Sequence, residues 1–169
     1  TLIARRYRDC GWVHWDLINE PSYAPADALW QNRPVGDESE KTAWGNWVLN
    51  RHGADALVLR DLWRDAWKEI LSLPLPNELS YAMIREHRRP RKACDFTHFS
   101  NDVVTAWAAD LRETLRGASG PSLVTLGQDQ GGTWVRPAQQ LYAPAVDYTA
   151  VHTWWNNDDL LWDGVVTKV

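Results

Sequence analysis

The residues most capable of chemistry in this chain lie at three places, each at the end of a predicted strand or just after it. Their side chains are carboxylates, amides, an imidazole and indoles, which can exchange protons, form hydrogen bonds to a ligand or stack against its apolar face. Because these residue types recur at the same position of three elements, they form one candidate site. They are Asn19 and Glu20, then Gln128 and Asp129, then His152, Trp154 and Trp155.

The first group follows an aromatic and β-branched run over residues 12–18, which predicts a mostly buried strand. Pro21 cannot donate a hydrogen bond to a neighbouring strand, so the strand must end before it. Residues 122–126 predict a second, short buried strand, and residues 146–155 predict a third with a polar and aromatic tip. Each candidate group therefore lies at the carboxyl end of a strand or in the loop that follows.

Helical patterns separate the predicted strands. Residues 1–9 are typical of the last turns of an amphipathic helix, and residues 158–169 predict the start of another. Residues 99–116 repeat apolar side chains at helical spacing, and Gly117 and Gly120 end that pattern. Strands that alternate with helices favour an α/β fold with a parallel sheet. In a (β/α)8 TIM barrel, the carboxyl ends of such strands carry the active site.

Residues 22–97 depart from this alternation. Within them, residues 37–70 predict two helices separated by a stop at residues 51–53, and residues 81–87 predict a further short helix. We expect this stretch to be a loop and helical insertion after the first strand, folded over the site. The insertion would belong to a single domain that comprises residues 1–169.

The length of the repeating part predicts how much of a barrel is present. Without residues 22–97, 93 of the 169 residues remain. A barrel of about 250 residues has about 31 residues in each βα unit, so the repeating part holds about three units. The predicted fold is therefore α/β, as a partial (β/α)8 TIM barrel.

The composition excludes several classes of protein. Hydrophobic residues make up 44% of the chain and charged residues 24%, which is typical of a globular protein and not of a disordered one. The net charge of −4 argues against a general nucleic-acid binder, and no apolar run has the length of about 18 residues that a membrane span needs. The 2 cysteines and 5 histidines lack the spacing of a disulfide framework or a metal site, so we expect no metal and no other cofactor. The localisation is left open by the sequence.

Three segments together resemble a known family. The run Trp-Asp-Leu-Ile-Asn-Glu-Pro at residues 15–21 resembles the fourth barrel strand of the clan A retaining glycoside hydrolases, especially family 5 and its cellulase and mannanase relatives. Residues 123–127 stand where the fifth strand should be, and residues 146–155 resemble the sixth. The resemblance covers residues 1–21 and 98–169. It implies the central part of an enzyme that hydrolyses a β-linked oligosaccharide or polysaccharide.

The resemblance also implies a role for each candidate residue. Glu20 would be the general acid/base, and Asn19 would hydrogen-bond the sugar 2-hydroxyl. His152 would line the floor of the sugar site. Trp154 departs from the family pattern, which commonly has a tyrosine there. Its indole N–H can donate a hydrogen bond but cannot accept one, so the hydrogen bonds at this position must differ from those of a tyrosine. The remaining candidate substrate-binding residues are Gln128, Asp129 and Trp155.

The 12 tryptophans against 2 phenylalanines indicate aromatic platforms as well as core. Trp154 and Trp155 are adjacent and cannot both point inward in a strand, so at least one should face a site or a loop. Further candidate platforms are Tyr23, Trp30 and Trp134. The tryptophans at helical spacing are predicted to be core; they are Trp44, Trp47, Trp63, Trp67 and Trp107.

Each role has a simpler alternative. Glu20 could cap a helix or be solvated, Asn19 could form a turn before Pro21, and His152 could be a hydrogen-bonded core residue. At the level of function, one alternative is a non-catalytic carbohydrate-binding or scaffold protein with a barrel fold. Another is an unrelated barrel hydrolase that uses Asp129, His152 and a metal.

The resemblance implies a glutamate nucleophile at the end of a seventh strand, and no such strand is predicted before Val169. We therefore expect the nucleophile to lie beyond Val169 and these residues alone to be inactive. A slice of a barrel would also expose sheet edges and apolar faces, which predicts poor solubility.

Overall fold

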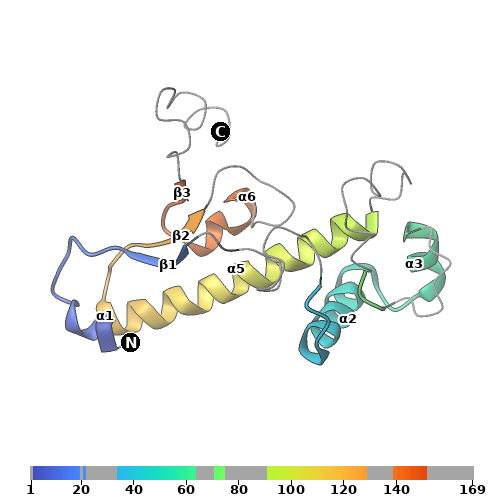
Figure 1. The fold of residues 1–169 in the computed structure, drawn as a ribbon, viewed down its shortest axis with the longest axis horizontal. Coiled ribbons are helices and arrows are strands. Elements are labelled where there is room, and N and C mark those ends of the chain that lie inside the picture. The colour runs from blue at the N-terminus through green and yellow to red at the C-terminus, as the bar shows by residue number, and fades with distance from the viewer. Residues whose placement is uncertain are drawn as a thin grey trace, which may run out of the picture. The chain divides into compact units, whose positions relative to one another are not determined.

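The computed structural model describes residues 2–19, 21, 34–63, 71–74, 91–128 and 139–151 (Figure 1). The chain divides into two compact units. The sheet unit consists of Thr1–Ser22 and Asn101–Val169, and the helical unit consists of Tyr23–Ser100. The elements in sequence order are α1 Leu2–Arg6, β1 Trp15–Asn19, α2 Glu38–His52, α3 Ala56–Trp63, α5 Arg91–Ser119, β2 Val124–Gln128, α6 Gln139–Tyr142, the 3-10 helix η3 Ala143–Ala145, and β3 Ala150–Val151.

The sheet unit contains a sheet of three strands in the order β1-β2-β3 (Figure 1). Both pairs of neighbouring strands are parallel. In sequence, α2, α3 and α5 lie between β1 and β2, and α6 lies between β2 and β3. The predicted α/β character and the parallel direction of the strands are confirmed.

The strand β1 is less buried than predicted. Leu17 packs against the core of the sheet unit, but its neighbour Ile18 is 41% exposed. Trp12 lies before the strand and is 79% exposed. Side chains of a strand alternate between the two faces of the sheet, and within the described residues only the face of Leu17 meets a core. The prediction of a mostly buried strand is therefore wrong for residues 12–18.

The other two strands begin later than predicted. β2 covers Val124–Gln128 rather than residues 122–126, and the described part of β3 is Ala150–Val151. Before β3, the backbone N–H of Asp147 donates to the carbonyl of Val124 (2.8 Å), while the Asp147 side chain turns to α5. Residues 146–148 therefore form a bend instead of continuing the strand, and residues 152–155 lie outside the described residues.

The core of the sheet unit lies between β2, α5 and the segment that includes α6 and η3. Ala108, Leu126 and Tyr142 are fully buried there, and Leu17 and Val104 pack against them.

The position of Trp107 corrects a prediction. Trp107 is 39% exposed, and Val103, one turn before it, is 48% exposed. Val104 and Ala108 carry the buried contacts, so the stripe that faces the core is displaced by one residue from Val103 and Trp107. The prediction that Trp107 is a core residue is wrong.

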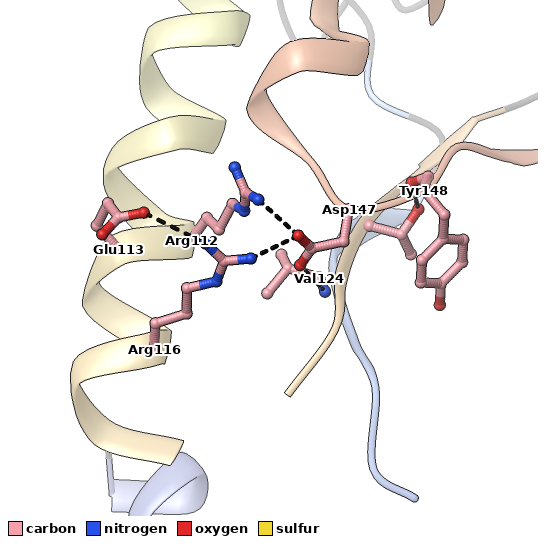
Figure 2. A network of polar contacts seen from close by, with 7 residues as sticks. Arg112, Glu113, Arg116, Val124, Asp147 and Tyr148 are labelled. Carbon is pink, nitrogen blue, oxygen red and sulfur yellow. Dashed lines mark hydrogen bonds and ion pairs between the residues drawn. The ribbon is translucent and has the colours of Figure 1, made fainter. Parts of the chain in front are cut away.

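One carboxylate, Asp147, joins α5 to the beginning of β2 (Figure 2). Figure 2 shows Arg112 and Arg116 extending from α5 toward Asp147, and each Nη2 lies 2.6 Å from Asp147 Oδ1. The backbone N–H of Val124 donates to the other carboxylate oxygen (2.9 Å). The Asp147 side chain is only 10% exposed, so these charge-assisted bonds are largely shielded from solvent.

The helical unit has a core of aromatic side chains from α2, α3 and the first part of α5. The Trp44 ring stacks on those of Trp47 and Trp63, with ring centroids 5.7 and 5.9 Å apart. Phe96 and Phe99 meet Trp44 edge-on. The predicted core positions of Trp44, Trp47 and Trp63 are confirmed, and Trp67 lies outside the described residues.

Both ends of α2 are capped, and its C-terminal end agrees with the predicted stop. Asp37 caps the first turn by accepting a hydrogen bond from the backbone N–H of Glu40 (2.7 Å). Gly53 ends the helix with φ of 82°, and its N–H donates to the carbonyl of Leu49 (2.9 Å). The predicted stop at residues 51–53 and the second helix after it are confirmed. The predicted helices over residues 81–87 and 158–169 lie outside the described residues.

The helix α5 begins eight residues before its predicted start at residue 99. Its first turns pack Ala93, Phe96 and Phe99 into the aromatic core of the helical unit, which stabilises this earlier start of the helix. At the other end, Gly117 is part of the helix. Gly120 ends it with φ of 77°, and its N–H donates to the carbonyl of Arg116 (3.0 Å).

Candidate active site

The carboxyl ends of the three strands lie side by side. Asn19 pairs with Gly127, Gly127 pairs with Ala150, and Gln128 pairs with Val151. Three segments that are far apart in the sequence therefore end at one edge of the sheet, as predicted from the strand order.

Two of the seven candidate residues fall within this described edge. Asn19 is the last residue of β1 and is exposed, and Gln128 is the last residue of β2. The other five follow the strand ends and lie outside the described residues, so their roles stay predictions. They are Glu20, Asp129, His152, Trp154 and Trp155. The further platform candidates Tyr23, Trp30 and Trp134 also lie outside the described residues.

Sequence reasoning missed a contact that joins the two strands at this edge. The backbone N–H of Gly127 donates to Asp16 Oδ1 (2.7 Å). A Cβ atom at residue 127 would overlap Asp16 Oδ2 and lie 3.1 Å from Asp16 Cγ, so the position requires glycine or a displaced carboxylate. The available sequence signal was a carboxylate within an apolar run, together with a glycine near the end of the next strand.

The strand pairing is irregular at the same place. Asp16 pairs with Thr125 and Asn19 pairs with Gly127, so β1 has one more residue than β2 between the two pairs. This arrangement is a β-bulge, which redirects the side chains that follow it.

Tyr142 is a second residue that the sequence did not single out. Its side chain is fully buried, and its hydroxyl has no hydrogen-bond partner within the described residues. Burial, and after it the negative charge of Asp16, raises the pKa of the Tyr142 hydroxyl, so the group is neutral at physiological pH.

The opposite edge of the sheet, where the strands begin, is held by structural contacts. Thr125 Oγ1 donates to the carbonyl of Tyr148 (2.7 Å), and the rings of His14 and Tyr148 lie 5.7 Å apart. Together with the contacts of Asp147 to Arg112, Arg116 and Val124, these contacts hold the starts of β2 and β3 together. The candidate site lies at the other ends of the strands.

Neither a metal-ligating cluster nor a membrane-spanning helix is found within the described ranges. Within the ranges that the structure describes, no three side chains of His, Cys, Asp and Glu gather as a metal site would need. Asp129 and His152, the residues of the alternative metal-dependent reading, lie outside those ranges. The helices within the described ranges also lack the apolar stretch that spanning a membrane would require.

Two solved structures share the fold of this chain, whereas no protein-family model and no curated protein sequence matches it. One is a β-galactosidase from the psychrophilic Marinomonas ef1, with a TM-score of 0.61 and 16% identity over 90% of this chain and 22% of that chain. The other is a polyextremophilic β-galactosidase from the Antarctic haloarchaeon Halorubrum lacusprofundi, with a TM-score of 0.65 and 19% identity over 90% and 22%.

The chain thus spans about a fifth of the length of the β-galactosidases it matches. At these identities the likeness shows a shared fold. Because the match spans 90% of the chain, it extends over both the sheet unit and the helical unit. Both matched proteins are β-galactosidases and neither is a cellulase or a mannanase, so the assignment to family 5 stays a prediction.

Proposed function

We propose that this chain is the central part of a retaining β-glycosidase with a (β/α)8 barrel, of which it supplies about three βα units. The observation that carries the proposal is the alignment of Asn19, Gly127 and Ala150 at one edge of a parallel sheet. Residues of catalytic type follow each of these strands in the sequence. The likeness in fold to two β-galactosidases supports the same class of enzyme.

In the proposed mechanism, Glu20 acts in both steps. It first gives its proton to the leaving oxygen as the bond between that oxygen and the anomeric carbon breaks, while a second carboxylate forms a bond to the same carbon. Glu20 then takes a proton from the water that displaces this carboxylate. The second carboxylate is proposed to lie about 5 Å away, outside these residues, and its negative charge keeps Glu20 protonated until the first step.

The other candidates are proposed to bind the sugar. Asn19 would donate its amide N–H to the 2-hydroxyl, a bond that strengthens in the transition state. The exposure of Asn19 at the strand end is consistent with this role. A β-galactoside is the substrate to test first, because both matched proteins are β-galactosidases. The remaining proposed contacts are Gln128, Asp129, His152, Trp154 and Trp155.

The proposal is tested with Glu20→Gln in the full natural polypeptide that contains these residues. The amide cannot give a proton to the leaving group, so kcat for methyl β-galactoside should fall by about 100- to 10,000-fold. The dissociation constant for the same sugar, measured by calorimetry, should change little because the two side chains have similar size.

The matched control is Glu38→Gln, which changes an 88% exposed carboxylate of α2 and should leave kcat unchanged. Two results contradict the proposal. In one, Glu20→Gln turns over substrate like the unmodified protein. In the other, the unmodified protein binds sugar without hydrolysing it, which supports the carbohydrate-binding alternative.

A further inference from the structure

The bulge in β1 decides which face of the sheet Asn19 occupies. Paired residues on neighbouring strands point to the same face, so Asn19 shares the face of Gly127, and Asp16 shares that of Thr125. Because Thr125 and Gly127 are two residues apart on one strand, all four positions lie on one face. Regular alternation along β1 would instead place Asn19 on the face of Leu17.

The exposures along β1 agree with this geometry. Trp15 and Leu17 are partly buried and Asp16 is exposed, as alternation requires, but Ile18 and Asn19 are then exposed in succession. The extra residue of the bulge therefore turns Asn19 away from the core that Leu17 contacts and onto the face of Asp16.

The side chain of Asp16 closes the bulge. Its Oδ1 accepts the N–H of Gly127, the residue that pairs with Asn19, and so joins the two ends of the irregular stretch across the strands. Its carboxylate also occupies the space that a side chain at residue 127 would fill. A side chain at residue 127 would therefore displace this carboxylate.

We propose that Asp16 is a positioning residue of the glycosidase site, whose carboxylate holds the bulge that sets the direction in which Asn19 and the chain after it leave β1. This role rests on the proposed function, since Asn19 and Glu20 are the groups being positioned. Asp16 acts through the backbone of Gly127 and need not touch the substrate.

The test compares three variants in the full natural polypeptide. Asp16→Ala removes the acceptor, Gly127→Ala keeps the carboxylate but fills its place, and Asp16→Asn keeps an oxygen that can accept the Gly127 N–H. We expect kcat/KM for methyl β-galactoside to fall about 100-fold in the first two, as for a small displacement of catalytic groups. Asp16→Asn should lose much less kcat/KM than the other two variants.

A second substrate separates positioning from simple stability. The kcat/KM for 2,4-dinitrophenyl β-galactoside, whose leaving group needs no proton, reports bond cleavage without the acid. A misplaced acid predicts a much larger loss on the methyl than on the dinitrophenyl substrate. A purely structural role lowers the amount of folded enzyme and reduces both values by the same factor.

Unchanged kinetics in Asp16→Ala, or equal losses on the two substrates that match the loss of folded enzyme, overturn the role of Asp16. Equal losses without a loss of folded enzyme place the effect on Asn19, which acts on both substrates. Glu20→Gln, measured in parallel, distinguishes this failure from that of the proposed function. If Glu20→Gln is inactive on the methyl substrate while Asp16→Ala is normal, only the positioning role is wrong. If Glu20→Gln is fully active, the proposed function is wrong, and the positioning role is wrong with it.

Discussion

A single residue, Asp147, joins two elements of the sheet unit through its carboxylate. Its carboxylate accepts bonds from Arg112, Arg116 and the backbone of Val124. Burial by itself would raise the pKa of Asp147, but the Val124 N–H and the two guanidinium groups outweigh it and hold the pKa below its ordinary value. The folded chain therefore prefers the ionised carboxylate.

This preference predicts how stability depends on pH. The contribution of Asp147 is complete above the ordinary pKa of an aspartate and is lost as the pH falls through the lowered value. Asp147→Asn should cost about 2 to 3 kcal/mol of unfolding free energy at pH 7 and much less at pH 2, measured by urea unfolding at both values. Glu113→Gln, which removes an exposed carboxylate 3.8 Å from Arg116, should cost under about 0.5 kcal/mol. A loss for Asp147→Asn that is the same at both pH values contradicts the account.

In the helical unit, the carboxylate of Asp95 likewise contacts side chains from two other helices. Its Oδ2 accepts the indole N–H of Trp63 (2.7 Å) and lies 3.1 Å from Nε2 of His52, with the Asp95 side chain only 13% exposed. The contact therefore satisfies polar groups at the edge of the aromatic core.

Removal of this acceptor should destabilise the helical unit. Asp95→Ala leaves the Trp63 N–H unpaired, which should cost about 1 to 3 kcal/mol in urea unfolding followed by tryptophan fluorescence. Asp95→Asn should lose clearly less, because its amide oxygen can still accept from Trp63. An unfolding midpoint for Asp95→Ala equal to that of the unmodified chain would show that the contact is not stabilising.

At the scale of elements, the sequence predicted those helix ends that depend only on residues close by in the chain. The predicted stop at residues 51–53 agrees with the described end of α2, and the Gly120 signal ends α5. The start of α5 could not be predicted in the same way. It depends on Phe96 and Phe99 meeting the rings of another helix, which is a tertiary contact.

The bulge of β1 had no reliable local signal either. Asn19 could be singled out because it ends an apolar run before a proline. Asp16 could not, because its role appears only when Gly127, 111 residues away in the sequence, pairs across the sheet. The exposure of Trp107 has a similar cause, since the packing of Ala108 with Leu126 and Tyr142 decides which side of α5 is buried.

At the scale of the whole molecule, the strand order predicted a parallel sheet with its candidate residues at one edge, and the described strands agree. Retaining glycosidase chemistry needs two carboxylates at such an edge, and Glu20 is proposed to be one of them. This chain spans about a fifth of the β-galactosidases that it matches in fold. That coverage is consistent with a site completed by other parts of a longer polypeptide.

The central claim is that Glu20 is the acid/base, and azide tests it most directly. In Glu20→Ala of the full natural polypeptide, a dinitrophenyl β-galactoside can still form the glycosyl-enzyme, but water then lacks its base and turnover stalls. Azide needs no base, so added azide should restore kcat and give β-galactosyl azide, identified by NMR. No effect of azide, or formation of the α-azide that loss of a nucleophile would produce, contradicts the assignment of Glu20.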